Sequence, residues 1–244
     1  MNEYVNLIEI FSSIQGEGKY VGCRQVFVRF AGCNLRCQYC DTANSYDHVD
    51  FCTIERDAGK RDFVSLANPL DLDVAIDQIN NLLLLPHHSV SFTGGEPLCN
   101  ALNIRKMAKK INAPIFLETN GTLPEALATV IHDIDIVSMD IKLPSTTNQI
   151  LWNEHKEFLK IAIHKDVFIK LVVSAETTED EFMTAIHLVK DVSNKIPFII
   201  QPVTPLNGCK AISPETVLKF QNAALQNLKD VRVIPQTHKF IDQM

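Results

Sequence analysis

Length, composition and charge restrict the function classes open to this sequence. The chain has 244 residues, 46% of them hydrophobic and 21% charged, which is sufficient for one large domain with a substantial core. Its net charge of −6 disfavours nucleic-acid binding, which needs a basic face. No N-terminal stretch resembles a signal peptide, and the longest apolar runs are too short to span a bilayer. We therefore expect a cytoplasmic protein that binds a small molecule, and neither nucleic acid nor a membrane.

Strands and helices are predicted to alternate along the chain. β-branched and apolar runs predict buried strands, and apolar residues at helical spacing predict helices between them. The predicted strands are residues 25–30, 89–92, 115–119, 134–139, 167–173, 198–203 and 231–234. The predicted helices are residues 71–85, 101–111, 124–132, 152–163, 179–189 and 214–228. Residues 43–69 fit no clear element, and we expect a long excursion over about 43–70 that caps the site.

This alternation predicts an α/β fold with a parallel sheet. About six strand–helix repeats favour a barrel or partial barrel, and a doubly wound sheet is the alternative. Both architectures bind ligands at the carboxyl ends of the strands. The segments that follow the predicted strands, among them "SFTGGEP", "FLETNG" and "VSMDIK", are unusually polar or glycine-rich. We therefore expect the functional site at this edge of the sheet.

Three of the seven cysteines lie within eight residues, in the loop 31–42 after the first of these strands. Cys33, Cys37 and Cys40 have the spacing C-x3-C-x2-C. In the cytosol thiols remain reduced, so this spacing indicates metal binding or catalysis rather than disulfides. Buried packing cysteines are one alternative, and a zinc site, which usually needs four ligands, is another. Three thiolates also suit an iron–sulfur cluster with one iron open to a ligand.

The cysteine motif, with Tyr39 before its last cysteine, together with "TGGEP" at residues 93–97, resembles the radical S-adenosylmethionine (SAM) superfamily. The resemblance covers most of the chain. It implies one domain over residues 1–244, with a partial (β/α)6-type TIM barrel. It also implies a [4Fe–4S] cluster on the three cysteines, whose open iron binds SAM and cleaves it reductively to a 5′-deoxyadenosyl radical.

Two flanking segments resemble the 7-carboxy-7-deazaguanine synthase family in particular. They are "FSSIQGEGKYVGCRQVFVRFAGCNLRCQYCDT" at residues 11–42 and "VRVIPQTHK" at residues 231–239. The resemblance implies the substrate 6-carboxy-5,6,7,8-tetrahydropterin, ring contraction with loss of ammonia, and regeneration of SAM. It implies substrate contacts by Ile14, Gln15, Gly16, Glu17, Arg29, Thr93 and His238, and Mg²⁺ on Thr42. An arginine fork suits a carboxylate, and Mg²⁺ prefers oxygen ligands.

The superfamily resemblance also suggests which residues bind SAM. Strand-end positions that would hold it are Gly95, Glu96, Glu118, Asn120, Ser138, Asp140, Lys142 and Gln201. "TNG" could instead be a simple turn and Asp140 a helix cap. The family resemblance further implies a homodimer and an electron donor such as flavodoxin or ferredoxin. Two other functions remain open: a radical SAM activating enzyme that makes a glycyl radical on a partner protein, and a zinc-binding module without catalytic activity.

Overall fold

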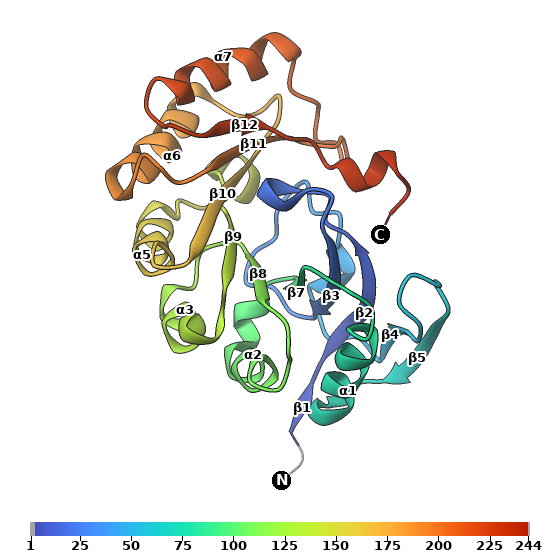
Figure 1. Ribbon diagram of the computed structural model, residues 1–244. Coiled ribbons are helices and arrows are strands. Elements are labelled where there is room, and N and C mark those ends of the chain that lie inside the picture. The colour runs from blue at the N-terminus through green and yellow to red at the C-terminus, as the bar shows by residue number, and fades with distance from the viewer. Residues whose placement is uncertain (1–2, 244) are drawn as a thin grey trace.

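A ten-stranded sheet is the centre of the fold in the computed structural model, which describes residues 3–243 (Figure 1). Its order is β12-β11-β10-β9-β8-β7-β3-β2-β4-β5. The seven strands from β3 to β12 in this order pair in parallel. They are β3 (Arg24–Phe30), β7 (Ser89–Gly94), β8 (Ile115–Thr119), β9 (Ile136–Asp140), β10 (Asp166–Val173), β11 (Phe198–Pro202) and β12 (Val231–Val233).

Six helices connect the parallel strands, as predicted. They are α1 (Leu72–Leu82), α2 (Ala101–Ala108), α3 (Pro124–Val130), α5 (Trp152–Ala162), α6 (Glu179–Val192) and α7 (Pro214–Leu225). The parallel strands follow one another in the sheet in chain order, without the reversal that defines a doubly wound sheet. Figure 1 shows α2, α3, α5, α6 and α7 along one side of the curved sheet. The fold is therefore an α/β partial barrel.

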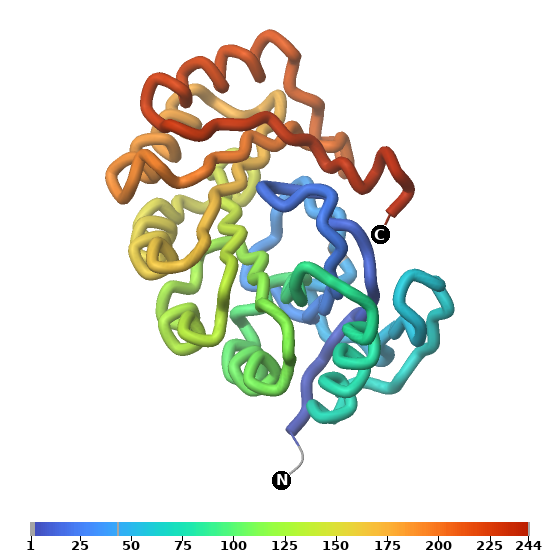
Figure 2. Tube along the Cα trace, in the orientation of Figure 1, coloured from blue at the N-terminus to red at the C-terminus, as the bar shows by residue number. Residues whose placement is uncertain are grey.

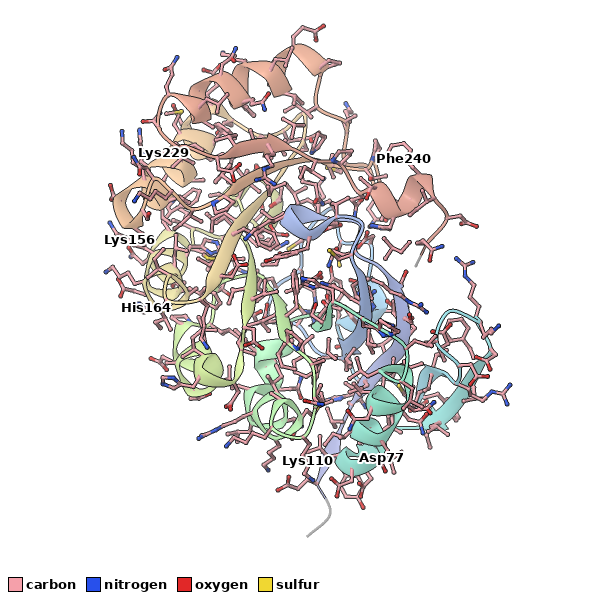
Figure 3. The ribbon with its side chains drawn as sticks, in the orientation of Figure 1. Asp77, Lys110, Lys156, His164, Lys229 and Phe240 are labelled. Carbon is pink, nitrogen blue, oxygen red and sulfur yellow. The ribbon has the colours of Figure 1, made fainter. Side chains whose placement is uncertain are left out.

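Helix starts follow from their capping residues. The Thr178 side chain accepts from the backbone N–H of Glu181, and Glu181 accepts from the backbone N–H of Thr178, which forms a capping box at the start of α6. Ser213 caps α7, whose first residue is Pro214. Figure 3 shows charged side chains such as Lys110, Lys156 and Lys229 at the outer edge of the molecule. The polar outer faces and apolar inner faces account for the helical periodicity of the sequence.

Aromatic and aliphatic side chains fill the barrel interior towards the amino-terminal ends of the parallel strands. Phe116, Ile136, Phe168 and Ile199 form a separate buried cluster inside the barrel, and Tyr20 packs against it. The Tyr20 ring centre lies 5.9 Å from that of Phe116 and 6.2 Å from that of Phe168. We call these five residues the apolar floor. The short helix η1 (Gly18–Tyr20) therefore packs its Tyr20 side chain against the inner face of the barrel.

The expectation that residues 43–69 form no regular element is wrong. The strands β4 (Phe51–Glu55) and β5 (Phe63–Ala67) form an antiparallel hairpin at the edge of the sheet. The hairpin joins β2 (Leu7–Ile14), a strand that sequence analysis also missed and that pairs with β3 in antiparallel fashion. The pattern LIEIFSSI does not alternate strictly, because both faces of β2 carry buried residues.

The remaining elements are short. They are β1 (Tyr4–Val5), which pairs with β6 (Leu70–Asp71), η2 (Ala43–Ser45), η3 (Pro97–Asn100), η4 (Ile131–Asp133), α4 (Pro144–Thr147) and η5 (Thr237–Phe240). The chain after β12 crosses towards the segment between β2 and β3, as the tube in Figure 2 shows. No helix in the described residues is long and apolar enough to cross a membrane.

Candidate active site

A cavity of about 240 Å³ opens above the apolar floor, at the carboxyl ends of the parallel strands. Three groups of side chains line it: the cysteine loop after β3, charged and polar residues at the ends of β8 to β11, and residues of the turn after β2, of β3 and β7, and of the C-terminal segment. The residues singled out in the sequence that line the cavity are Gln15, Glu17, Arg29, Cys33, Cys37, Cys40, Thr42, Thr93, Gly95, Glu118, Asn120, Ser138, Asp140, Lys142, Gln201 and His238.

The cysteine loop forms one wall of the cavity. Cys33, Cys37 and Cys40 are free thiols, all partly exposed. Burial raises the pKa of the Cys33 and Cys37 thiols. Backbone hydrogen bonds hold the loop: the N–H of Gly32 donates to the carbonyl of Ser45 at 2.8 Å, and the carbonyl of Gly32 accepts from the N–H of Glu96, after β7, at 2.8 Å. The loop therefore places three thiols on one side of the cavity.

Gly95 allows this loop to approach the end of β7. A Cβ atom added at Gly95 would lie 2.2 Å from the carbonyl oxygen of Gly32 and 2.8 Å from that of Ser45. Both atoms belong to backbone that cannot move aside as a side chain could. The glycine of "TGGEP" thus serves close packing against the cysteine loop.

The opposite wall carries an ion pair and two unpaired acceptors. Lys142 donates to Asp140 Oδ2 at 2.8 Å and to the hydroxyl of Tyr39 at 3.1 Å. Burial would lower the pKa of Lys142, but Asp140, Tyr39 and Cys37 together outweigh it and the pKa is raised. Asp140 Oδ1 and Gln201 Oε1 are buried without a hydrogen-bond partner. Two such acceptors in one cavity favour a ligand that brings N–H or O–H donors.

The third wall holds a second ion pair. Lys170 pairs with Glu17 and lies 3.4 Å from Asp140 Oδ2. Burial would raise the pKa of Glu17, but Lys170, with smaller effects of Gln236 and His238, outweighs burial and lowers the pKa to about 2. The Arg29 Nε donates to Glu9 Oε1 at 2.6 Å, across the β2–β3 pair. Sequence analysis did not identify Lys170, although a lysine inside a buried strand is a recognisable signal.

Glu118 connects two residues of this wall. It accepts from Gln15 Nε2 at 2.6 Å and from the hydroxyl of Thr93 at 2.8 Å. The other end of the Gln15 amide accepts from the backbone N–H of Glu17 at 3.0 Å. The orientation of the Gln15 amide is therefore fixed by its neighbours.

The C-terminal segment closes part of the cavity mouth. Gln236 Nε2 donates to Glu17 Oε1 at 2.7 Å and to Asp41 Oδ2 at 3.2 Å. Lys239 lies 3.3 Å from the same Asp41 oxygen. This segment, Gln236 to Lys239, therefore contacts both the Gln15–Gly18 turn and the cysteine loop.

Three of the residues singled out in the sequence are not in the cavity lining. Ile14 ends β2, and a Cβ atom at Gly16 would meet the ring of His238. Glu96 is fully buried behind the wall, where it accepts from Asn120 N at 2.7 Å and from the hydroxyl of Thr119 at 2.8 Å. Burial raises the pKa of Glu96 to about 7.

Comparison with known proteins shows to which family the chain belongs. The model of the radical SAM superfamily matches residues 27–194. The chain is 43% identical to a 7-carboxy-7-deazaguanine synthase of Geobacter sulfurreducens, over 98% of this chain and 97% of that protein. A synthase of the same name from Archaeoglobus fulgidus is 36% identical over 97% of both chains. The chain belongs to the 7-carboxy-7-deazaguanine synthase family.

Solved structures agree on the fold of this 7-carboxy-7-deazaguanine synthase family member. QueE from Escherichia coli has a TM-score of 0.60 at 21% identity, covering 96% of this chain and 95% of that one. A radical SAM methyltransferase from Sphaerobacter thermophilus has a TM-score of 0.61 at 12% identity, covering 87% of this chain and 66% of that one. At these identities the likeness concerns the fold alone. The alternative of a glycyl-radical activating enzyme is not favoured, because full-length relatives carry the synthase name.

Membership in the radical SAM superfamily implies a [4Fe–4S] cluster and SAM, and the residues present fit both. Three reduced thiols on one wall are the soft ligands that iron–sulfur clusters take. The unpaired Asp140 Oδ1 and Gln201 Oε1 suit the amino and hydroxyl donors of SAM. In the described residues, no group of three or more His, Cys, Asp or Glu side chains is placed to hold a single metal ion.

Proposed function

We propose that this chain converts 6-carboxy-5,6,7,8-tetrahydropterin to 7-carboxy-7-deazaguanine with loss of ammonia, as a radical SAM lyase of deazapurine (queuosine-type) biosynthesis. One observation carries the proposal: a single cavity has three free thiols on one wall and, on another, Arg29 with Gln15 and Glu17 of the QGEG segment, which the family resemblance links to the pterin. The cluster and SAM would supply the radical that starts the rearrangement.

The SAM side of the proposed site is the wall formed by the ends of β8, β9 and β11. Asp140 Oδ1 and Gln201 Oε1 would accept from SAM, and the Lys142 ammonium would attract its carboxylate. Asn120 and Ser138 complete the polar lining of this wall. We also propose that Gly95, Glu96 and Glu118 contribute to SAM binding, with Glu96 acting from behind the wall.

The pterin side is the wall formed by β3 and the turn that follows β2. Arg29 uses its Nε for Glu9, and its two terminal nitrogens would bind the pterin carboxylate as a fork. Glu17, held ionised by Lys170, would accept from the N–H donors of the pterin edge. The other residues that we propose to contact the substrate are Ile14, Gln15, Gly16, Thr93 and His238.

Mg²⁺ has a proposed ligand in Thr42. Its side-chain hydroxyl lines the cavity 3.8 Å from Cys40 Sγ, at the end of the cysteine loop. Mg²⁺ takes few protein ligands and completes its shell with water and substrate oxygens. A pterin carboxylate held by Arg29 would supply such an oxygen, so the ion would orient the substrate between the two walls.

We further propose a cytoplasmic homodimer that folds as a single radical SAM domain. All seven cysteines are free thiols, as expected in a reducing compartment. The electron for SAM cleavage would come from a small redox protein such as flavodoxin or ferredoxin. Sedimentation of the anaerobic protein tests the dimer directly.

The decisive test is anaerobic turnover. The protein is reconstituted with iron and sulfide, given dithionite, SAM, Mg²⁺ and 6-carboxy-5,6,7,8-tetrahydropterin, and assayed for 7-carboxy-7-deazaguanine by mass spectrometry. Cys37→Ala should abolish product and SAM cleavage. Cys99→Ala is the matched control, since Cys99 is exposed and outside the cavity lining, and it should retain activity. Cleavage of SAM without deazaguanine in the wild type would refute the pterin assignment and leave the superfamily chemistry intact.

A further inference from the structure

His155 is a fully buried histidine behind the cavity wall. It lies on α5, outside the cavity lining, and its ring reaches two loops at the ends of neighbouring strands. Nδ1 is 3.1 Å from the carbonyl oxygen of Gly121, in the loop after β8. Nε2 accepts from the backbone N–H of Lys142, in the loop after β9, at 3.1 Å. One side chain thus joins two loops that are otherwise separate in the chain.

These two contacts determine the protonation state of the ring. A backbone carbonyl can only accept, so Nδ1 must carry a hydrogen. A backbone N–H can only donate, so Nε2 must be unprotonated. The ring is therefore the neutral Nδ1–H form. Burial lowers the pKa of His155 to about 4, which agrees with this form at neutral pH. The charged groups that affect it are Asp140 and Lys142, which act in opposite directions.

Both loops extend from His155 to the cysteine loop. Next to Gly121, Asn120 Nδ2 donates to Asn34 Oδ1 at 2.8 Å. The Lys142 ammonium donates to the hydroxyl of Tyr39 at 3.1 Å. Asn34 and Tyr39 alternate with the three cysteines along the chain. The neutral imidazole therefore lies behind these two bridges, and Asn34 Nδ2 adds a third by donating to the hydroxyl of Thr122 at 2.9 Å in the same loop as Gly121.

We propose that His155 is a positioning residue, which fixes the loops after β8 and β9 and thereby sets the gap between the cysteine loop and the wall that binds SAM. This inference rests on the proposed function, because it assigns that wall to SAM. His155 itself touches neither ligand. Its effect passes through the backbone of Gly121 and Lys142, whose buried polar groups would lose their partners without the ring.

The test compares three variants of the reconstituted holoenzyme. His155→Phe keeps the ring volume and removes both hydrogen bonds, and His155→Gln restores a donor and an acceptor. Phe158→Leu is the matched control, because Phe158 is fully buried on the same helix and its hydrocarbon side chain makes no hydrogen bond to either loop, so its substitution changes packing alone. SAM binding is measured by equilibrium dialysis, and unfolding by circular dichroism.

We expect His155→Phe to weaken SAM binding by about tenfold, with partial recovery in His155→Gln and a change below about twofold in Phe158→Leu. Unchanged SAM affinity in His155→Phe overturns the proposal, and so does an equal loss in Phe158→Leu, which would mark general destabilisation. If His155→Phe does not fold, long-range ¹⁵N–¹H NMR of the wild-type histidines decides: a neutral Nδ1–H ring supports the proposal and an Nε2–H or charged ring refutes it. Failure of the wild type to bind SAM would instead refute the proposed function.

Discussion

The ion pair between Glu17 and Lys170 allows a quantitative prediction. The side chains are 18% and 13% exposed, so water screens the pair only weakly. The pKa of Glu17 falls from 4.5 to about 2: burial opposes this net shift, Lys170 is the main lowering cause, and Gln236 and His238 add to it. At about 1.4 kcal/mol per pKa unit this difference corresponds to about 3 kcal/mol. Breaking a buried pair by removing one partner costs ~3–5 kcal/mol, which is the same range. Lys170→Met should therefore lower the free energy of unfolding by about 3 kcal/mol at pH 7.

The sign of the pH dependence distinguishes this pair from simple loss of packing. In the wild type the lowered pKa of Glu17 makes its stabilising contribution complete above pH 4.5, so the pair remains intact between pH 5 and pH 7. Without Lys170, burial raises the pKa of Glu17, and the variant then gains stability as pH falls and the carboxylate is protonated. The loss in free energy of unfolding of Lys170→Met relative to the wild type should therefore be smaller at pH 5 than at pH 7.

Urea unfolding at both pH values, monitored by circular dichroism under anaerobic conditions, measures the effect. Glu17→Gln and the double variant complete a thermodynamic cycle that isolates the pair. The reasoning fails if the coupling energy is below about 0.5 kcal/mol, the level at which distant sites are additive. It also fails if the loss in Lys170→Met is the same at pH 5 and pH 7.

Three further substitutions test other parts of the structure. Gly95→Ala places a methyl group against the Gly32 carbonyl, so we expect a loss of ~1–3 kcal/mol in urea unfolding and impaired cluster reconstitution; normal cluster content would contradict this packing. Glu9→Gln removes the charge that orients Arg29, and KM for the pterin should rise about tenfold while SAM affinity stays unchanged; an equal loss in both would argue against the orienting role. Thr178→Ala removes the cap of α6 and should cost ~1 kcal/mol in the free energy of unfolding without altering either substrate constant.

Much of the barrel is predictable because its parallel strands are covered on both faces. Such strands are continuous apolar runs, and each is followed by an amphipathic helix. The ends of the helices and strands are predicted less accurately than their presence. The helix predicted to continue to residue 85 ends at Leu82, and Leu84 beyond it is 81% exposed. The apolar run "LLLL" extends the helical pattern past the point where the chain leaves the core.

The strands β2, β4 and β5 could not be read from local pattern. β5 is the edge strand and pairs only with β4 in the sheet order, and β4 joins the sheet by pairing with β2 through Glu9–Thr53 and Ile10–Ile54. Short edge strands carry little periodic signal of their own. Tertiary pairing, rather than propensity, forms this part of the sheet.

The residues of the candidate site were predictable in its loops, whereas inside its strands the sequence marks a charged residue such as Lys170 as unusual without showing its partner. The cysteine loop and the strand-end motifs are local sequence patterns. Lys170 and Glu9 are charged residues in strands, and their importance appears only when the fold brings them to Glu17 and Arg29. The spacing of residues along the sequence does not indicate which tertiary partners such side chains meet.

The apolar floor determines from which side molecules reach the reaction chamber. Because Tyr20, Phe116 and Phe168 block the amino-terminal end of the barrel, molecules enter and leave through the opposite end. That end is where Gln236 and Lys239 contact Asp41. A barrel closed at its base gives arriving substrates and departing products one shared opening. Control of that opening therefore falls to the C-terminal segment and its contacts with the cysteine loop.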